Sequence, residues 1–218
     1  MKISQETVEV LKNFNSIQPS VLIRPGQTLA TMTPNKTIAA WARISEEFPA
    51  RAAIAELGKF LGALSLFKGV DPELEVGENH LTITDGRQTI EYTLGEESLI
   101  AVPPENPPAG PPVVVEFDLQ WADLDKAVKA MNVLGLQHLA INGAGGHVVL
   151  RAVDRKNRAK DHYKIYVGET DKEFETFLDK DNLLVLAKDY RLQVSEGLVR
   201  FVNPAVTYWI AAAAPVKE

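Results

Sequence analysis

The chain has 218 residues, of which 45% are hydrophobic and 24% are charged, with a formal net charge of −6. This composition is typical of a folded globular protein rather than a disordered or fibrous one, and the acidic balance disfavours general adhesion to nucleic acid or anionic membranes. The complete lack of cysteine excludes disulfides, thiolate metal sites and a thiol nucleophile. No apolar run approaches a membrane span, and the first residues lack the apolar core of a signal peptide, so we expect a cytosolic protein.

The first hundred residues carry patterns for two helices and several strands. Ser4 is a good helix N-cap, and apolar residues at helical spacing after it predict a helix over residues 5–15. Strand-like runs at 21–24 and 28–32 flank Pro25-Gly26 and predict a hairpin. Apolar residues from Leu57 to Phe67 predict a second amphipathic helix. Three alternating runs then predict a closing antiparallel meander: 74–76, 81–84 and 90–93.

A proline-rich segment follows. Residues 102–112 hold six of the 13 prolines, and such a run cannot continue a helix or a sheet interior. We interpret residues 101–112 as a semi-rigid connector between a first domain at 1–100 and a second at 113–218.

The second half repeats the same order of patterns. Apolar residues from Leu124 to Leu134 predict a helix, and runs at 139–142 and 148–152 around a glycine-rich tip predict a hairpin. A shorter helix is predicted at 180–187 with Asp179 as its N-cap. The last meander is predicted at 192–194, 199–202 and 208–212.

Short sequence matches support a duplication. Val21-Leu22-Ile23 recurs as Leu139-Ala140-Ile141, and Leu74-Glu75-Val76 recurs as Leu192-Gln193-Val194 at the same offset. We therefore predict two similar α+β domains, each with helices on one face of an antiparallel sheet.

Motifs for metal or phosphate chemistry are weak. The four histidines, at 80, 138, 147 and 162, show no metal-ligand spacing, which favours structural or surface roles. The segment from Asp179 to Tyr190 begins like a calcium loop but lacks the glycine and the final carboxylate. The glycine-rich segment at 142–146 precedes a strand rather than a helix, so a hairpin tip is favoured over a phosphate cradle. We therefore expect no enzymatic activity, no cofactor and no metal.

Lysines on the predicted helices are more informative. Lys12, Lys59, Lys126 and Lys129 project away from the apolar stripes. The plain interpretation is a solvated face in which these lysines pair with neighbouring acids. The alternative is a basic surface that contacts phosphate. A second basic cluster, residues 151–160, is predicted in a hairpin loop, where solvation or a phosphate or partner contact are both open.

Three segments taken in order resemble one known family. Leu11–Phe14 in the first helix, Lys59–Leu66 in the second and the strand Leu81–Asp85 are similar to the sliding clamps of T-even-type bacteriophages, which are DNA polymerase processivity factors. The resemblance is close over residues 1 to about 100 and returns as pattern in residues 113–213.

The resemblance implies a closed ring of three head-to-tail subunits, in which helices line a central hole for duplex DNA and sheets form the outer wall. Such a ring would tether the replicative DNA polymerase and be opened and closed by an ATP-driven clamp loader. Phage late transcription factors are further partners that the resemblance implies. We therefore expect the protein to act in the cytoplasm of the infected bacterial host. The ring would retain DNA by its topology, while diffuse lysine contacts would permit sliding.

Site residues follow from the resemblance and from the helical projection. The resemblance assigns Lys12 and Lys59 to DNA, and the projection adds Lys126 and Lys129. The remaining candidates for DNA contact are Lys2, Lys68 and Lys180. For a partner's C-terminal peptide we expect a site built from Leu99, Ile100, Val102, Val113, Tyr208, Ile210 and Ala212. The alternative functions are a two-domain protein-interaction adaptor without DNA encirclement and a small-molecule enzyme with its site at the domain junction.

Overall fold

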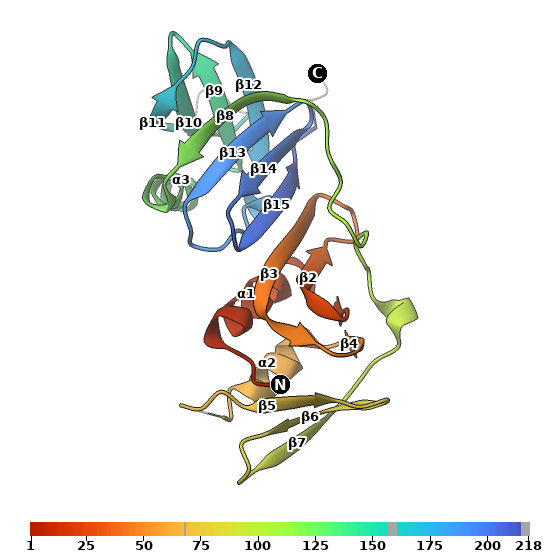
Figure 1. Ribbon diagram of the computed structural model, residues 1–218. Coiled ribbons are helices and arrows are strands. Elements are labelled where there is room, and N and C mark those ends of the chain that lie inside the picture. Colours follow the sequence, from red (N-terminus) through yellow and green to blue (C-terminus); the bar gives the residue numbers. More distant parts are fainter. Residues whose placement is uncertain (68, 157–160, 215–218) are drawn as a thin grey trace. The chain divides into compact units, whose positions relative to one another are not determined.

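The computed structural model describes residues 1–67, 69–156 and 161–214 and divides the chain into two compact units. The first unit comprises Met1–Pro107 together with Pro204–Val206, and the second comprises Pro108–Asn203 together with the chain from Thr207 onward. In Figure 1 the first unit's main segment, Met1–Pro107, runs from red to yellow-green, and the chain then continues through green to blue. No helix in the described ranges is long and apolar enough to cross a membrane.

Two helices form the first unit's helical layer. α1 (Gln5–Ile17) begins after Ser4, whose Oγ accepts a hydrogen bond from the backbone N–H of Thr7 at 3.3 Å. α2 (Leu57–Leu64) matches the predicted second helix. The two helices contact each other, and α1 also contacts β2 (Gly26–Met32) and β3 (Ile38–Phe48). The predicted N-cap at Ser4 is confirmed.

The first unit's strands pair differently from the predicted hairpin. β1 (Val21–Ile23) pairs antiparallel with β4 (Ala52–Ile54), whereas β2 pairs with β3. The hairpin around Pro25-Gly26 is therefore wrong. Gly26 has φ 110°, a conformation that glycine adopts readily, and the chain turns sharply there. β2 therefore does not pair with β1, which pairs with β4 instead.

The closing meander of the first unit is confirmed. β5 (Glu73–Val76), β6 (His80–Thr84) and β7 (Thr89–Thr93) form a three-stranded antiparallel sheet in that order. Its buried face contributes Leu74, Leu81, Ile83 and Tyr92 to the core. Alternation of apolar and polar residues therefore identified this sheet correctly.

The second unit contains one long helix and two antiparallel strand groups. β8 (Val113–Leu119) leads into α3 (Trp121–Leu134), which ends at Gly135 in the left-handed conformation with φ 64°. α3 packs against β9 (His138–Ala144), β10 (His147–Val153) and β11 (Tyr163–Glu169). The β9–β10 hairpin confirms the predicted one.

The strand orders in the second unit follow from its pairings. One sheet has the order β11-β10-β9-β12, with β12 at Phe174–Asp179. In the other group β14 (Leu198–Val202) pairs with both β13 (Tyr190–Ser195) and β15 (Val206–Ala211), and β13 pairs with β8. The final meander is therefore confirmed, and the α+β class with helices on antiparallel sheets is correct.

The predicted helix at 180–187 is wrong. Only a 3₁₀ turn, η2 (Lys180–Asn182), forms there, and Asp179 makes no side-chain cap. Two buried tyrosines bind the backbone beyond it: Leu186 N–H donates to Tyr208 Oη at 3.2 Å, and Tyr190 Oη donates to the Leu186 carbonyl at 2.8 Å. These phenols satisfy the backbone groups that a helix would otherwise have paired.

Side chains hold the proline-rich segment within each unit, and a short 3₁₀ turn, η1 (Glu97–Leu99), precedes it. In the first unit Arg24 Nη2 donates to the Pro103 carbonyl at 2.9 Å. In the second, Arg200 Nη1 donates to the Ala109 carbonyl at 3.1 Å. Proline has no backbone N–H, so this segment cannot join a sheet or a helix that would pair its carbonyls. The two arginines donate to these carbonyls instead.

Candidate functional site

Lys12 lies on the exposed face of α1. Leu11 and Phe14, on the opposite face, are fully buried and fix the rotation of the helix about its axis. Lys12 also borders a groove of about 480 Å³ whose walls include Val8 and Leu61. The lysine therefore projects from a rigid helix whose register is set by the core.

A carboxylate from β3 holds the start of α1. Glu46 Oε2 accepts a hydrogen bond from Thr7 Oγ1 at 2.6 Å, and its Oε1 accepts one from the Ser4 backbone N–H. Ser45 Oγ donates to the same carboxylate at 2.9 Å. Burial alone would raise the pKa of Glu46, but the hydrogen bonds from Thr7 and Ser4 outweigh it and lower this pKa to about 2.

Glu46 was missed in the sequence interpretation. Its partners lie about forty positions earlier in the chain, and the strand that carries it was not predicted. Only the capping signal at Ser4 was visible. A carboxylate at a helix N-terminus also interacts favourably with the helix dipole, so Glu46 fixes both the place and the direction of α1.

Lys59 lies on the exposed face of α2. Leu57 and Phe60 are fully buried beneath it, and the Phe60 ring meets the Tyr92 ring edge-on with centroids 5.3 Å apart. Tyr92 Oη donates to the Glu56 carbonyl at the helix start at 3.1 Å. This sequence of contacts anchors α2 on β7.

The two lysines of α3 are paired within the helix. Lys126 Nζ lies 3.0 Å from Asp123 Oδ1, and Lys129 Nζ lies 2.5 Å from Asp125 Oδ2. These are the i,i+3 and i,i+4 pairs of a solvated helix face. Within the described ranges Lys12 and Lys59 form no such pair.

The remaining lysine candidates differ in accessibility. Lys2 is exposed beside β5, where its backbone forms an isolated bridge with Glu73. Lys180 is half-buried in η2. Lys68 lies outside the described residues. The structure therefore presents Lys2, Lys12 and Lys59 as exposed cations of the first unit, and their role in binding stays a prediction.

The residues predicted for a partner peptide divide by burial. Leu99 is 78% exposed on η1, and Val113 is 38% exposed at the start of β8. Ile100 is buried in a small cluster, against which Val102 packs. The other three lie in the second unit: Tyr208 and Ile210 are fully buried, and Ala212 donates its N–H to the Gly197 carbonyl. Leu99 and Val113 are therefore the side chains that a peptide could reach directly.

In the part of the chain that the structure describes, no group of three or more His, Asp or Glu side chains is arranged to hold a metal ion. His138 Nε2 lies 3.5 Å from Asp179 Oδ1, and burial of the ring lowers its pKa more than Asp179 raises it.

Comparison with known proteins identifies the family. Residues 3–102 match the profile described as DNA polymerase processivity factor, and residues 116–214 match gp45 sliding clamp, C terminal. The sliding clamp of Vibrio phage KVP40 is 32% identical over 98% of this chain and 100% of its own length. The chain belongs to the sliding-clamp family.

Two further relatives agree. The sliding clamp of Enterobacteria phage T4 is 27% identical and covers 98% of this chain and 97% of its own. The solved structure of A. fulgidus PCNA bound to the C-terminal region of FEN-1 has a TM-score of 0.72 at 13% identity, covering 96% of each chain. The fold is thus that of clamp proteins, and the protein is a phage-type DNA sliding clamp and processivity factor.

Proposed function

We propose that three copies of this chain close into a ring around duplex DNA and tether the replicative DNA polymerase. The observation that carries the proposal is the pair of exposed lysines without ion-pair partners in the described ranges, Lys12 and Lys59, on the helices of a clamp-family fold. They offer sequence-independent attraction to phosphate. Lys126 and Lys129 contribute less because Asp123 and Asp125 already neutralise them.

Two uncovered sheet edges favour head-to-tail assembly. In the described part of the chain the outer edge of β7 and the outer edge of β11 pair with no other strand. The opposite edges of these two sheets are partly covered: Leu74 N–H on β5 donates to the Met1 carbonyl, and the Phe177 carbonyl on β12 accepts from Ala213 N–H. We propose that β7 of one subunit pairs with β11 of the next, which is a heterologous contact that can close into a ring.

The partners extend this proposal. Domains at 1–100 and 113–218, joined by the segment 101–112, would supply six similar units per ring. An ATP-driven clamp loader would open the ring, the polymerase would bind through its C-terminal peptide, and phage late transcription factors would use the same route in the cytoplasm of the infected cell. A PCNA relative solved with the C-terminal region of FEN-1 supports peptide docking as the mode of recruitment. The clamp itself would have no catalytic role.

Retention on DNA tests encirclement. Loaded clamp should remain on nicked circular DNA and leave the same DNA once it is linearised, because only a closed ring is held by topology. Equal loss from both forms would contradict encirclement and favour the adaptor hypothesis, in which the chain binds proteins alone. A trimer in solution at micromolar concentration supports the ring, although dilution dissociates weak assemblies.

The lysine contacts are tested by salt dependence. Lys12→Gln with Lys59→Gln should reduce the slope of log affinity for DNA against log salt by about 0.9 for each phosphate that the variant no longer neutralises. Lys36→Asn is the matched control, since it removes one positive charge in the β2–β3 turn, where φ 59° suits asparagine. An unchanged slope in the double variant would show that these lysines do not face DNA.

Tyr166 and Leu99 separate assembly from recruitment. Tyr166 is 60% exposed on β11, where it meets His147 edge-on with centroids 5.5 Å apart. Tyr166→Asp should weaken the trimer in sedimentation, whereas Leu99→Asp should leave the trimer intact and weaken polymerase stimulation. The reverse pattern would refute the β11 contact.

A further inference from the structure

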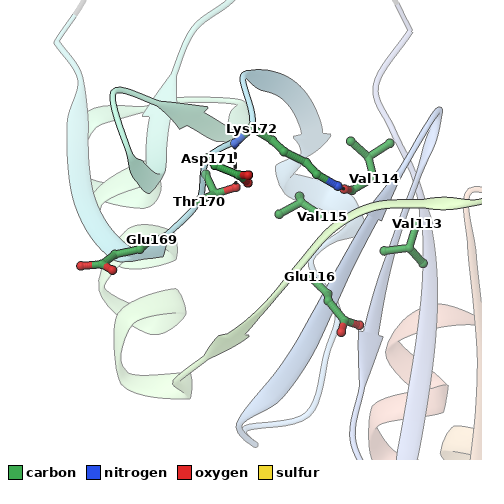
Figure 2. Close-up of a pocket in the computed structure, with 8 residues that line it drawn as sticks. All are labelled: Val113, Val114, Val115, Glu116, Glu169, Thr170, Asp171 and Lys172. Atoms are coloured by element: carbon green, nitrogen blue, oxygen red, sulfur yellow. Dashed lines mark hydrogen bonds between the residues drawn. The ribbon is translucent and has the colours of Figure 1, made fainter.

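A groove in the second unit contains Val113, one of the residues predicted for a partner peptide, and Glu169, the last residue of β11. It has a volume of about 430 Å³ and lies between the first residues of β8, Val113–Glu116, and the turn from β11 to β12, Glu169–Lys172. Deeper along the two strands the walls meet, since a Cβ at Gly168 would lie 3.9 Å from the Phe117 Cβ. Figure 2 shows the two walls facing each other, with Lys172 reaching from the turn toward β8.

A β-bulge shapes the apolar wall. β8 pairs Val115 with Val194 and then Val113 with Ser195, so the register shifts and Val114 has no partner in the ladder. Strict alternation would direct only one of two successive valines to the surface. With the bulge, Val113 and Val114 are 38% and 41% exposed. Bulges of this kind redirect side chains.

Lys172 fixes this wall. Its Nζ donates a hydrogen bond to the carbonyl of Val114, the residue that the ladder leaves unpaired. The contact joins the turn to the bulge across the groove, so both walls are held before any ligand arrives. A preformed groove lowers the entropy cost of binding.

The rim of the groove is acidic. Glu169 and Asp171 are exposed, and in the described ranges neither forms an ion pair. Glu116, on the other wall, lies 2.9 Å from Arg191, which lowers the pKa of this carboxyl through a charged hydrogen bond. Asp171 therefore remains available for a cation.

We propose that this groove binds a short extended segment of a partner protein in which a lysine or arginine stands next to an aliphatic residue. The aliphatic side chain packs on Val113 and Val114, and the cation lies beside Asp171. The negative charge of the rim disfavours nucleic acid. An apolar wall next to a negative charge is complementary to a peptide that carries an aliphatic and a basic side chain. This site would recruit a partner independently of Lys12 and Lys59.

Fluorescence anisotropy on the full chain tests the proposal. The probe is a fluorescein-labelled heptapeptide of alternating valine and lysine, and its matched control alternates valine and glutamate. The lysine peptide should bind with a Kd on the order of 0.1 mM, as expected for a small exposed site, and the glutamate peptide should not bind. No DNA is present, so the result is independent of encirclement.

Two matched double variants locate the site. Val114→Thr with Asp171→Asn should weaken binding about five- to tenfold, which is the effect of removing one exposed ion pair and one apolar methyl group. Val70→Thr with Asp71→Asn makes the same chemical changes at an exposed valine and carboxylate of the first unit and should leave the Kd unchanged. Methyl resonances of Val113 and Val114 should shift on titration with the same Kd. Equal weakening in both double variants, or no weakening in the first, would overturn the proposal, as would peptide-induced shifts confined to other methyl groups.

Discussion

Replacing Glu46 by glutamine tests how α1 is held. The carboxylate accepts hydrogen bonds from Thr7 Oγ1, at 2.6 Å, and from the Ser4 backbone N–H. The amide keeps one acceptor oxygen but turns a donor toward groups that also donate. Glu46→Gln should therefore loosen the start of the helix that carries Lys12, without changing the core beneath it.

The size of the effect follows from the pKa of Glu46. Lowering that pKa from 4.5 to about 2 would correspond to about 3 kcal/mol of folding free energy at neutral pH. The side chain is partly exposed, so solvent screening reduces the expected contribution to about 1–2 kcal/mol. Because the folded-state pKa is depressed, this stability is fully present above pH 4.5 and is lost as the pH falls from 4.5 toward 2.

Amide hydrogen exchange of α1 is the appropriate measurement, since a chain of two units need not unfold in one step. At pH 7 the amides of Val8–Leu11 should exchange about 5- to 30-fold faster in the variant. After correction for intrinsic rates, most of this difference should disappear at pH 3. Glu47→Gln is the matched control, because Glu47 is the exposed neighbour on β3. Equal protection in wild type and Glu46→Gln at pH 7 would refute the assigned role.

Four further substitutions test the second unit, each by calorimetric melting. Gly143→Ala should destabilise it by about 1–3 kcal/mol, since the added Cβ would lie 2.4 Å from the Lys172 carbonyl oxygen. Gly135→Ala should cost about 1–2 kcal/mol because φ 64° is left-handed, and Gly135→Asn should cost less. Tyr208→Phe should cost about 1–3 kcal/mol by leaving the Leu186 N–H unpaired. Unchanged melting of any of these variants would contradict the contact it removes or strains.

Helical periodicity made the three main helices predictable. The buried positions of α1, α2 and α3 recur every three to four residues. The sequence pattern matches the structure because each helix buries a single face. The meander β5-β6-β7 was equally visible, since its strands alternate and follow one another in the sheet. Local patterns thus identified these helices and this meander, whereas β3 and β11, which pair with their neighbours β2 and β10, were not predicted.

Long-range pairing accounts for two of the errors. β3 is buried at several successive positions, including Ala40, Trp41 and Ala42, so it lacks the alternation of a half-exposed strand. β1 pairs with β4 rather than with the adjacent β2, and a turn signal such as Pro25-Gly26 cannot show which partner a strand will take. Residues 183–186 are apolar enough for a helix, but the hydroxyls of Tyr190 and of the more distant Tyr208 bind the backbone of Leu186 instead. The errors at β1 and at residues 183–186 involve a partner far away in sequence, whereas β3 was missed beside its neighbour β2.

The site was only partly readable for the same reason. Exposure of Lys12 and Lys59 followed from the helical projection, and the structure places both on exposed faces. The pairing of Lys126 and Lys129 with acids on α3 was present in the spacing as the solvated-face alternative. The role of Glu46 and the bulge at Val114 depend on contacts between residues far apart in sequence, so no local sequence pattern predicted them.

The charges of the three helices bear directly on how a clamp would move. α1 carries Glu6 and Glu9 against Lys12, α2 carries only Lys59, and the two lysines of α3 face two aspartates, so the helices together are formally neutral. Each tight phosphate contact releases counterions and must be broken again at every step along DNA. Helices of balanced charge therefore allow movement but cannot supply retention. Retention must come from ring closure, and so the strength of the proposed β7–β11 contact, rather than affinity for DNA, would set how long the polymerase stays tethered.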